Sequence, residues 1–104
     1  MKSIIIFDLA GTFAENKDVA REIRKREIIP ALDRDEQVTL DFQRVNGTTQ
    51  SFIHALISEV LRKYGGDVLD RVFFKSCNET IQQIINMVVD YMQEGMGIDT
   101  EGVD

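Results

Sequence analysis

The stretch at residues 38–61 changes its hydrophobic spacing halfway along, and this change restricts the fold more than any other feature of the sequence. Its first six residues alternate between apolar and polar side chains, as in a strand with one face on a core. Beyond Ser51 the apolar residues recur at helical spacing instead. They are Phe52, Ile53, Leu56, Ile57, Val60 and Leu61. The sequence therefore predicts a strand that passes through a short polar turn into a largely buried helix.

Hydroxyl groups gather in the turn at residues 46–52, where the predicted helix begins. Thr48, Thr49 and Ser51 carry oxygens that can accept hydrogen bonds from the first amide groups of a helix. The same helix end favours a phosphate or another anion, because the peptide dipoles point toward it. The candidate partner-binding or phospho-acceptor residues are Thr48, Thr49, Gln50, Ser51 and His54. For any single hydroxyl, plain helix capping is the simpler interpretation, and one histidine makes neither a metal site nor a catalytic triad.

Two further apolar runs predict the other strands of the sheet. Residues 3–9 are so continuously apolar that we expect them inside the sheet, with both faces covered or nearly so. Residues 68–74 predict a third strand. Residues 12–13 predict a short additional strand, and an antiparallel edge between it and the first strand is one arrangement that we consider.

Residues that cap or end helices divide the rest of the chain. Asn16 is a suitable cap for a first helix, and we expect Pro30 to end or kink this helix by moving Ile29 out of the helical region. Residues 31–37 then form a polar link. Gly65 ends the central helix. Asn78 caps the last helix, in which Met87 and Met92 are expected to fill the core.

The order of the predicted elements is strand, helix, strand, helix, strand, helix. It predicts an α/β fold, a single small domain with a mainly parallel (mixed) sheet and helices packed on the sheet. A chain of 104 residues with 43% hydrophobic residues is large enough for one self-sufficient core. We assign the domain to residues 1–94 and a flexible, acidic, glycine-rich tail to residues 95–104.

Charge and cysteine content restrict the partners and the compartment. The formal charge of -6 argues against nucleic acid, since binding to phosphate backbones depends on clustered Lys and Arg. The basic run at residues 21–26 is interrupted by Glu22 and is typical of a solvated helix face. No apolar stretch approaches the roughly 20 residues that cross a bilayer. With one cysteine, Cys77, and no signal-peptide pattern, we expect a cytoplasmic protein that contacts neither nucleic acid nor membrane.

Three stretches carry a family resemblance. IIIFDLAGTFAENKDVAREI resembles the opening of STAS domains, the fold of anti-sigma-factor antagonists, and LDFQRVNGTTQSFIHALI resembles their central strand, regulatory turn and following helix. Together with FFKSCNETIQQII, they look like the STAS-like family of unknown function, over residues 4–92. The antagonists carry Asp-Ser-Ser/Thr-Gly in the turn, where a kinase phosphorylates a hydroxyl. Here Thr49-Gln50-Ser51-Phe52 takes its place, and the acceptor position falls on Gln50 or Ser51.

The resemblance implies a non-enzymatic regulatory or protein-interaction module, controlled by phosphorylation at the strand-to-helix turn. Its partner would be a regulatory protein with a kinase-type ATP-binding domain, which binds and phosphorylates such domains. We expect no cofactor. A sensor of a small anionic ligand or nucleotide, which would use the same helix end, is the alternative. A homodimer through an exposed edge strand also remains open.

Two aspartates invite an enzymatic interpretation. Asp8 begins a run that is one residue from the Asp-x-Asp-Gly-Thr opening of haloacid-dehalogenase-like phosphatases, but Ala10 stands where their general acid would be. A degenerate phosphatase is therefore a third hypothesis. Asp41 resembles the phospho-accepting aspartate of receiver domains. Its place within the strand pattern instead favours a solvent-facing role or a bond to neighbouring backbone amides.

Overall fold

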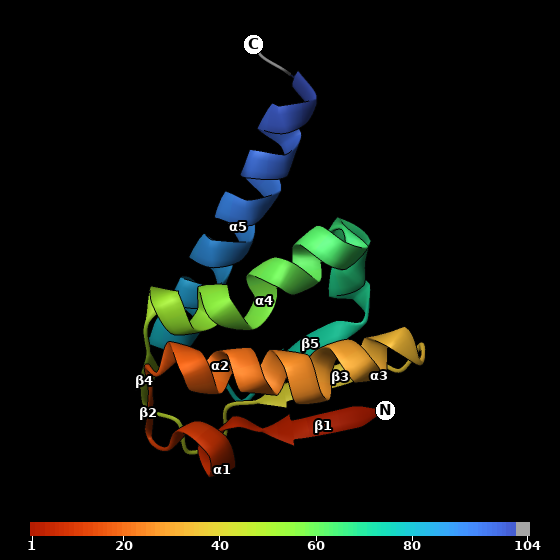
Figure 1. Ribbon diagram of the computed structural model, residues 1–104. Coiled ribbons are helices and arrows are strands. Elements are labelled where there is room, and N and C mark those ends of the chain that lie inside the picture. Colours follow the sequence, from red (N-terminus) through yellow and green to blue (C-terminus); the bar gives the residue numbers. More distant parts are fainter. Residues whose placement is uncertain (102–104) are drawn as a thin grey trace.

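A three-stranded parallel sheet forms the base of the molecule (Figure 1). The computed structural model describes the backbone of residues 1–101 and the side chains of residues 1–93. The sheet has the order β1-β3-β5 and consists of β1 (Lys2–Ile5), β3 (Val38–Asp41) and β5 (Val72–Lys75). Lys2, Val38 and Val72 lie side by side at its first row. The predicted α/β class and the parallel pairing of the strands are confirmed.

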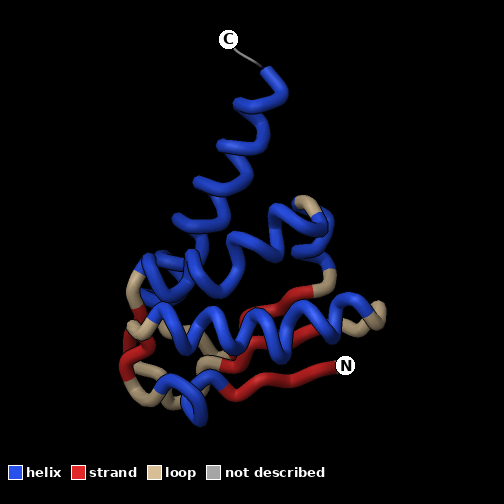
Figure 2. The backbone as a smooth tube through the Cα atoms, viewed as in Figure 1, coloured by secondary structure: helices blue, strands red, loops and turns tan. Residues whose placement is uncertain are grey.

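The helices that connect these strands lie on one side of the sheet (Figure 2). Helix α2 (Lys17–Ile23), a π-helical segment (Arg24–Ile28) and α3 (Ile29–Asp33) connect β1 to β3, and α4 (Gln50–Tyr64) lies between β3 and β5. Parallel neighbours need such crossovers, and crossovers of the same hand between strands in sequential order place their helices on the same face. The last helix, α5, spans Glu79–Glu101.

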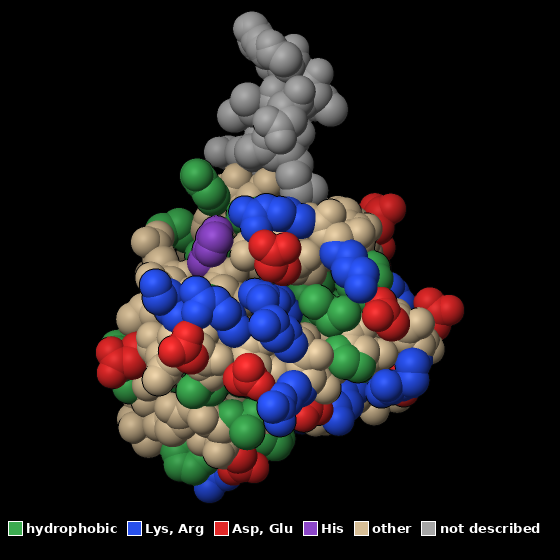
Figure 3. All heavy atoms as spheres, in the orientation of Figure 1, with side chains coloured by type: hydrophobic (Ala, Val, Ile, Leu, Met, Phe, Trp, Pro, Cys, Tyr) green, Lys and Arg blue, Asp and Glu red, His purple; other side chains and the backbone are tan. Residues whose placement is uncertain are grey.

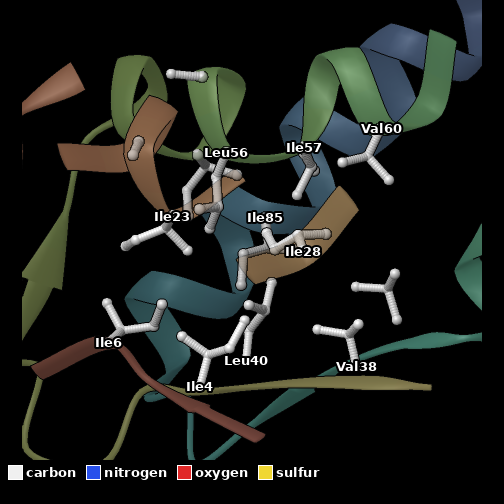
Figure 4. Packing of buried hydrophobic residues seen from close by; sticks show 14 of the residues in the cluster. Ile4, Ile6, Ile23, Ile28, Val38, Leu40, Leu56, Ile57, Val60 and Ile85 are labelled. Carbon is white, nitrogen blue, oxygen red and sulfur yellow. The ribbon is translucent and has the colours of Figure 1, made fainter. Parts of the chain in front are cut away.

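The core fills the space between the helices and one face of the sheet. Ile4, Val38 and Leu40 point from the strands toward the helices, where Ile23, Ile28, Leu56, Ile57 and Ile85 meet them (Figure 4). All of these side chains are buried. The alternating pattern of the central strand is confirmed.

The opposite face of the sheet is only partly covered, contrary to the expectation for residues 3–9. Ser3, Thr39 and Phe73 form one row across the three strands on this face, and the Phe73 side chain is 41% exposed. Ser3 is also exposed. The expectation of two covered faces is wrong because residues 6–9 of the apolar run are not in the strand.

The apolar run leaves the strand after Ile5 and bends into a helix. Residues Ile6–Ala10 form α1, which buries Ile6 and leaves Leu9 49% exposed. The amide of Gly11 donates to the Phe7 carbonyl at 2.9 Å, and Gly11 adopts a φ of +80° that a side chain would disfavour. A short apolar run does not by itself distinguish a strand from a buried helical turn.

A second, two-stranded sheet lies beside the start of α4. It pairs β2 (Phe13–Ala14) with β4 (Gly47–Thr48) in parallel, so the antiparallel edge with the first strand is wrong. The amide of Asn46 donates to the Thr12 carbonyl at 2.7 Å, which connects the predicted turn to this strand. Part of the expected turn is therefore a strand.

The first long helix continues through Pro30 instead of ending there. Ile29 keeps helical angles, with φ −63° and ψ −44°, and its amide donates to the Arg24 carbonyl across the π-helical turn. Pro30 stands in the first turn of α3, directly after the π-helical segment, and a helix tolerates proline in its first turn. The predicted polar link is consequently shorter, because Ala31 and Leu32 are buried in α3.

The predicted third strand begins later than expected. Residues Gly66–Asp70 form a 3-10 helix that buries Val68, and only Val72–Lys75 pair with β3. Gly65 ends α4 with a φ of +83°, as predicted. Asn78 caps α5, since its Oδ1 accepts the Ile81 amide at 2.8 Å. The division at residue 94 and the flexible tail remain predictions, and residues 102–104 lie outside the described residues.

Candidate functional site

Two of the predicted site residues have structural roles. The Thr48 hydroxyl donates to the Ala14 carbonyl at 2.7 Å, and its side chain is buried, so it holds β4 against β2. Thr49 is the N-cap of α4, where its Oγ1 accepts the Phe52 amide at 3.1 Å. The capping interpretation is therefore confirmed for Thr49.

The other three candidates face solvent together. Gln50, Ser51 and His54 are exposed on the first two turns of α4, and all three line one recess of about 800 Å³. The recess lies between α2, α4 and α5, and its floor includes Ala55 and Ser58, both buried. The structure thus separates the five predicted residues into a structural pair and an exposed group of three.

One bank of the recess is basic. Lys17, Arg21 and Arg24 follow each other at helical spacing on the continuous helix that begins at α2, and all three line the recess. Figure 3 shows Lys and Arg side chains gathered beside the histidine. Arg21 pairs with Asp18 at 2.7 Å, and Arg24 donates to the Ala55 carbonyl at 2.8 Å. Within residues 1–93, Lys17 has no ion-pair partner.

The other bank is apolar and belongs to α5. Met87 and Tyr91, which lie one turn apart, are 50% and 69% exposed, and Val88 is buried beside them. The expectation that Met87 fills the core is wrong, whereas Met92 is buried as predicted. The Gln50 amide contacts the Met87 sulfur, which connects the start of α4 to this bank.

The charge of the recess is opposite to that of the whole chain. Four of its lining residues are cationic, namely Lys17, Arg21, Arg24 and Arg62, and one, Glu59, is anionic. The chain as a whole has a formal charge of -6. Glu59 forms an ion pair with Arg62 at 2.7 Å. The recess therefore offers a positive surface beside an apolar one.

Sequence reasoning missed both banks. The spacing of residues 17, 21 and 24 was a usable signal, because it places three cations on one helix face. The sequence predicts only a solvated face for the basic run at residues 21–26, since nothing in it shows that α2 lies beside α4. Met87 was assigned to the core for the same reason, because its helical spacing does not reveal that α5 passes the recess at this turn.

The aspartates proposed for enzymatic roles lie apart from the recess. Asp8 is exposed on α1, and is not at the end of a strand. Asp41 is buried, and its Oδ1 accepts the Gln43 amide at 2.9 Å, so the predicted bond to a neighbouring backbone amide is confirmed and the solvent-facing alternative is wrong. Among the described residues, no three His, Cys, Asp or Glu side chains are grouped in a way that could hold a metal.

The only cysteine of the chain, Cys77, is half-buried. Burial and, to a smaller extent, the nearby Asp41 carboxylate raise the pKa of the Cys77 thiol to about 11. His54 lies in the recess on α4, whereas Cys77 lines a separate pocket beside β5. The two residues are not brought together.

No helix within the described part of the chain has the length and apolar character needed to cross a membrane.

Comparison with known proteins identifies the family. A family model described as a STAS-like domain of unknown function matches residues 19–82, which include most of α2 and all of β3, β4, α4 and β5. Arg21, Arg24 and Ser51 lie inside the match, whereas Lys17 and Tyr91 lie outside it. Searches of curated proteins and of solved structures return no significant match. The chain therefore belongs to the family of STAS-like domains of unknown function.

Proposed function

We propose that this domain is a non-enzymatic regulatory module that binds a partner protein at the recess between α2, α4 and α5. One observation carries the proposal: the exposed residues at the start of α4 share a recess with the large apolar side chains of Met87 and Tyr91. Aromatic residues and methionine are enriched at protein interfaces, and exposed apolar patches with a polar rim commonly mark contact sites.

Ser51 is the residue at which the module would be regulated. Thr48 and Thr49 use their hydroxyls within the fold, and Gln50 has none, so Ser51 is the exposed hydroxyl of the predicted turn. A phosphate there would add roughly −1.5 to −2 charge next to a helix N-terminus and beside Lys17 and Arg21. By the resemblance to anti-sigma-factor antagonists, the partner would contain a kinase-type ATP-binding domain.

A pull-down from the host lysate tests the proposal. The intact chain is compared with the double variant Met87→Ser and Tyr91→Ser, and bound proteins and the peptide around Ser51 are analysed by mass spectrometry. We expect one partner to be lost from the double variant. The matched control is Leu9→Ser with Phe73→Ser, which removes two exposed apolar side chains outside the recess and should retain that partner. Equal capture by all three proteins would contradict the proposal.

The second candidate function is a sensor of a small anionic ligand. The volume of the recess, about 800 Å³, lies within the range of ligand pockets, and its cations would hold phosphate or carboxylate. A thermal-shift screen with nucleotides tests it, since a ligand at 100 times its dissociation constant adds about 2.7 kcal/mol of stability. A rise in melting temperature that disappears in Lys17→Gln with Arg21→Gln would favour the sensor. No rise with any nucleotide would count against the sensor and favour the protein-binding module.

A further inference from the structure

We propose that the recess binds an acidic amphipathic helix of the partner protein. The inference rests on the proposed function and specifies the chemistry of the partner. It follows from the arrangement of the recess, in which a basic bank on α2 and the start of the π-helical segment faces an apolar bank on α5 across a floor formed by α4.

The spacing of the basic bank suits a helix. Lys17, Arg21 and Arg24 stand at i, i+4 and i+7, so they share one face and span about 10 Å along the axis. A partner helix with carboxylates at the same intervals would place one beside each cation. A compact anion, in contrast, would reach the cations at one end of the bank only.

The spacing of the apolar bank matches as well. Met87 and Tyr91 lie four residues apart on α5, and their exposed side chains border the same recess. Large apolar residues one turn apart on a partner helix would contact them, as in other complexes where an amphipathic helix lies in a groove. One helix with an acidic stripe next to an apolar stripe would satisfy both banks at once.

The electrostatics select an acidic partner over a neutral or basic one. Lys17 has no carboxylate partner within residues 1–93, and Arg24 is held by a backbone carbonyl alone. The ion pair of Arg21 with Asp18 is exposed, with side-chain exposures of 47% and 86%, and exposed pairs of this kind are weak and exchange readily. Lys17 and Arg21 can therefore meet new carboxylates, and Arg24 adds positive charge beside them while it holds the Ala55 carbonyl. A basic helix would be repelled.

Selection from a random peptide library tests the inference on the intact chain. Displayed 16-residue peptides are selected on the wild-type protein and depleted on the Met87→Ser and Tyr91→Ser variant, so that only peptides using the recess remain. We expect the selected peptides to carry Asp or Glu at spacings of three or four residues, next to Leu, Ile or Phe. Selected peptides that are neutral or basic would overturn the inference.

Fluorescence anisotropy with the strongest synthetic peptide then measures the contribution of the basic bank. In Lys17→Gln with Arg21→Gln we expect about a tenfold weaker affinity, and a similar loss when the glutamates of the peptide become glutamines. The matched control, Lys25→Gln with Arg26→Gln, removes the same charge from neighbouring exposed residues that do not line the recess. It should change the affinity less than about twofold. Equal weakening by both double variants would mean a general charge effect and would overturn the inference.

Binding of the lysate partner to the two double variants distinguishes a failure of this inference from a failure of the proposed function. A partner lost from the Met87→Ser and Tyr91→Ser variant, but retained by Lys17→Gln with Arg21→Gln at low and high salt, would support the proposed function and overturn the acidic helix. A partner lost from both variants, with binding that weakens as salt is added, would support both.

Discussion

At the scale of single residues, the structure separates the turn's two hydroxyls that hold the fold from the one that is exposed to solvent. Thr48 and Thr49 bond the backbone of β2 and α4, whereas Ser51 is exposed in the recess as the second residue of the same helix. The sequence identified the segment, because caps and phosphate sites both occur at helix starts. It did not reveal which hydroxyl has which role, since that depends on β2, which lies 34 residues earlier in the chain.

Alanine substitutions test which of these hydroxyls stabilises the fold. Thr49→Ala removes the acceptor of the Phe52 amide and should lower the free energy of unfolding by about 1 kcal/mol. Ser51→Ala should change it by less than about 0.5 kcal/mol, because its side chain is exposed. Urea unfolding of the two variants checks both values. A larger loss for Ser51→Ala than for Thr49→Ala would show that the cap is assigned to the wrong residue.

The Cys77 thiol offers a second test at this scale. Its pKa is raised to about 11, first by burial and then by Asp41, so the reactive thiolate should be scarce below that pH. Reaction with a disulfide reagent at pH 8 should be roughly 100-fold slower than in the urea-unfolded chain, and the rate should increase up to about pH 11. Equal rates for the folded and unfolded protein at pH 8 would contradict the burial of this thiol.

At the scale of helices and strands, the sequence predicted where elements lie along the chain, but not which elements pack against each other. The spacing of apolar residues predicted α4 and β3, and Asn16, Gly65 and Asn78 acted at helix ends as expected. These outcomes depend on residues close together in the chain. The π-helical turn before Pro30 and the pairing of β2 with β4 depend on contacts between distant segments, and the sequence pattern does not contain them. The recess depends on such contacts too.

A tyrosine joins two helices and supplies a test of their packing. The Tyr64 hydroxyl at the end of α4 donates to the Asp33 carboxylate at the end of α3, and burial followed by this contact raises the pKa of Tyr64 to about 12. Because the folded-state pKa is above the unfolded value, the stabilisation is complete below about pH 10 and is lost as the pH rises toward 12.

Absorbance of tyrosinate follows this ionisation. In the Tyr91→Phe variant Tyr64 is the only tyrosine, so a single transition with a midpoint near 12 is expected in the folded protein. In urea the midpoint should fall to about 10. Asp33→Asn, which removes the carboxylate, should lower the folded-state midpoint. A midpoint near 10 in the folded variant would mean that α3 and α4 are not joined through this contact.

At the scale of the whole molecule, the sheet is packed on one face. Parallel sheets are normally covered on both faces, and the continuous apolar run at residues 3–9 suggested the same here. Instead Leu40 of the central strand is fully buried under the helices, while Phe73, on the opposite face of β5, is 41% exposed. Stability should therefore depend on the residues that face the helices much more than on those that face away.

Two truncations in the sheet test this asymmetry. Leu40→Ala leaves a cavity between the sheet and the helices and should lower the free energy of unfolding by about 2–5 kcal/mol. Phe73→Ala removes a larger side chain from a face that stays in contact with water, so its cost should be less than about 1 kcal/mol, although a core phenylalanine would cost about 3–5. Urea unfolding at two protein concentrations measures both. A loss for Phe73→Ala as large as that for Leu40→Ala, and present only at the higher concentration, would mean that a second copy of the chain covers this face. Both faces of the sheet would then be covered only in a dimer.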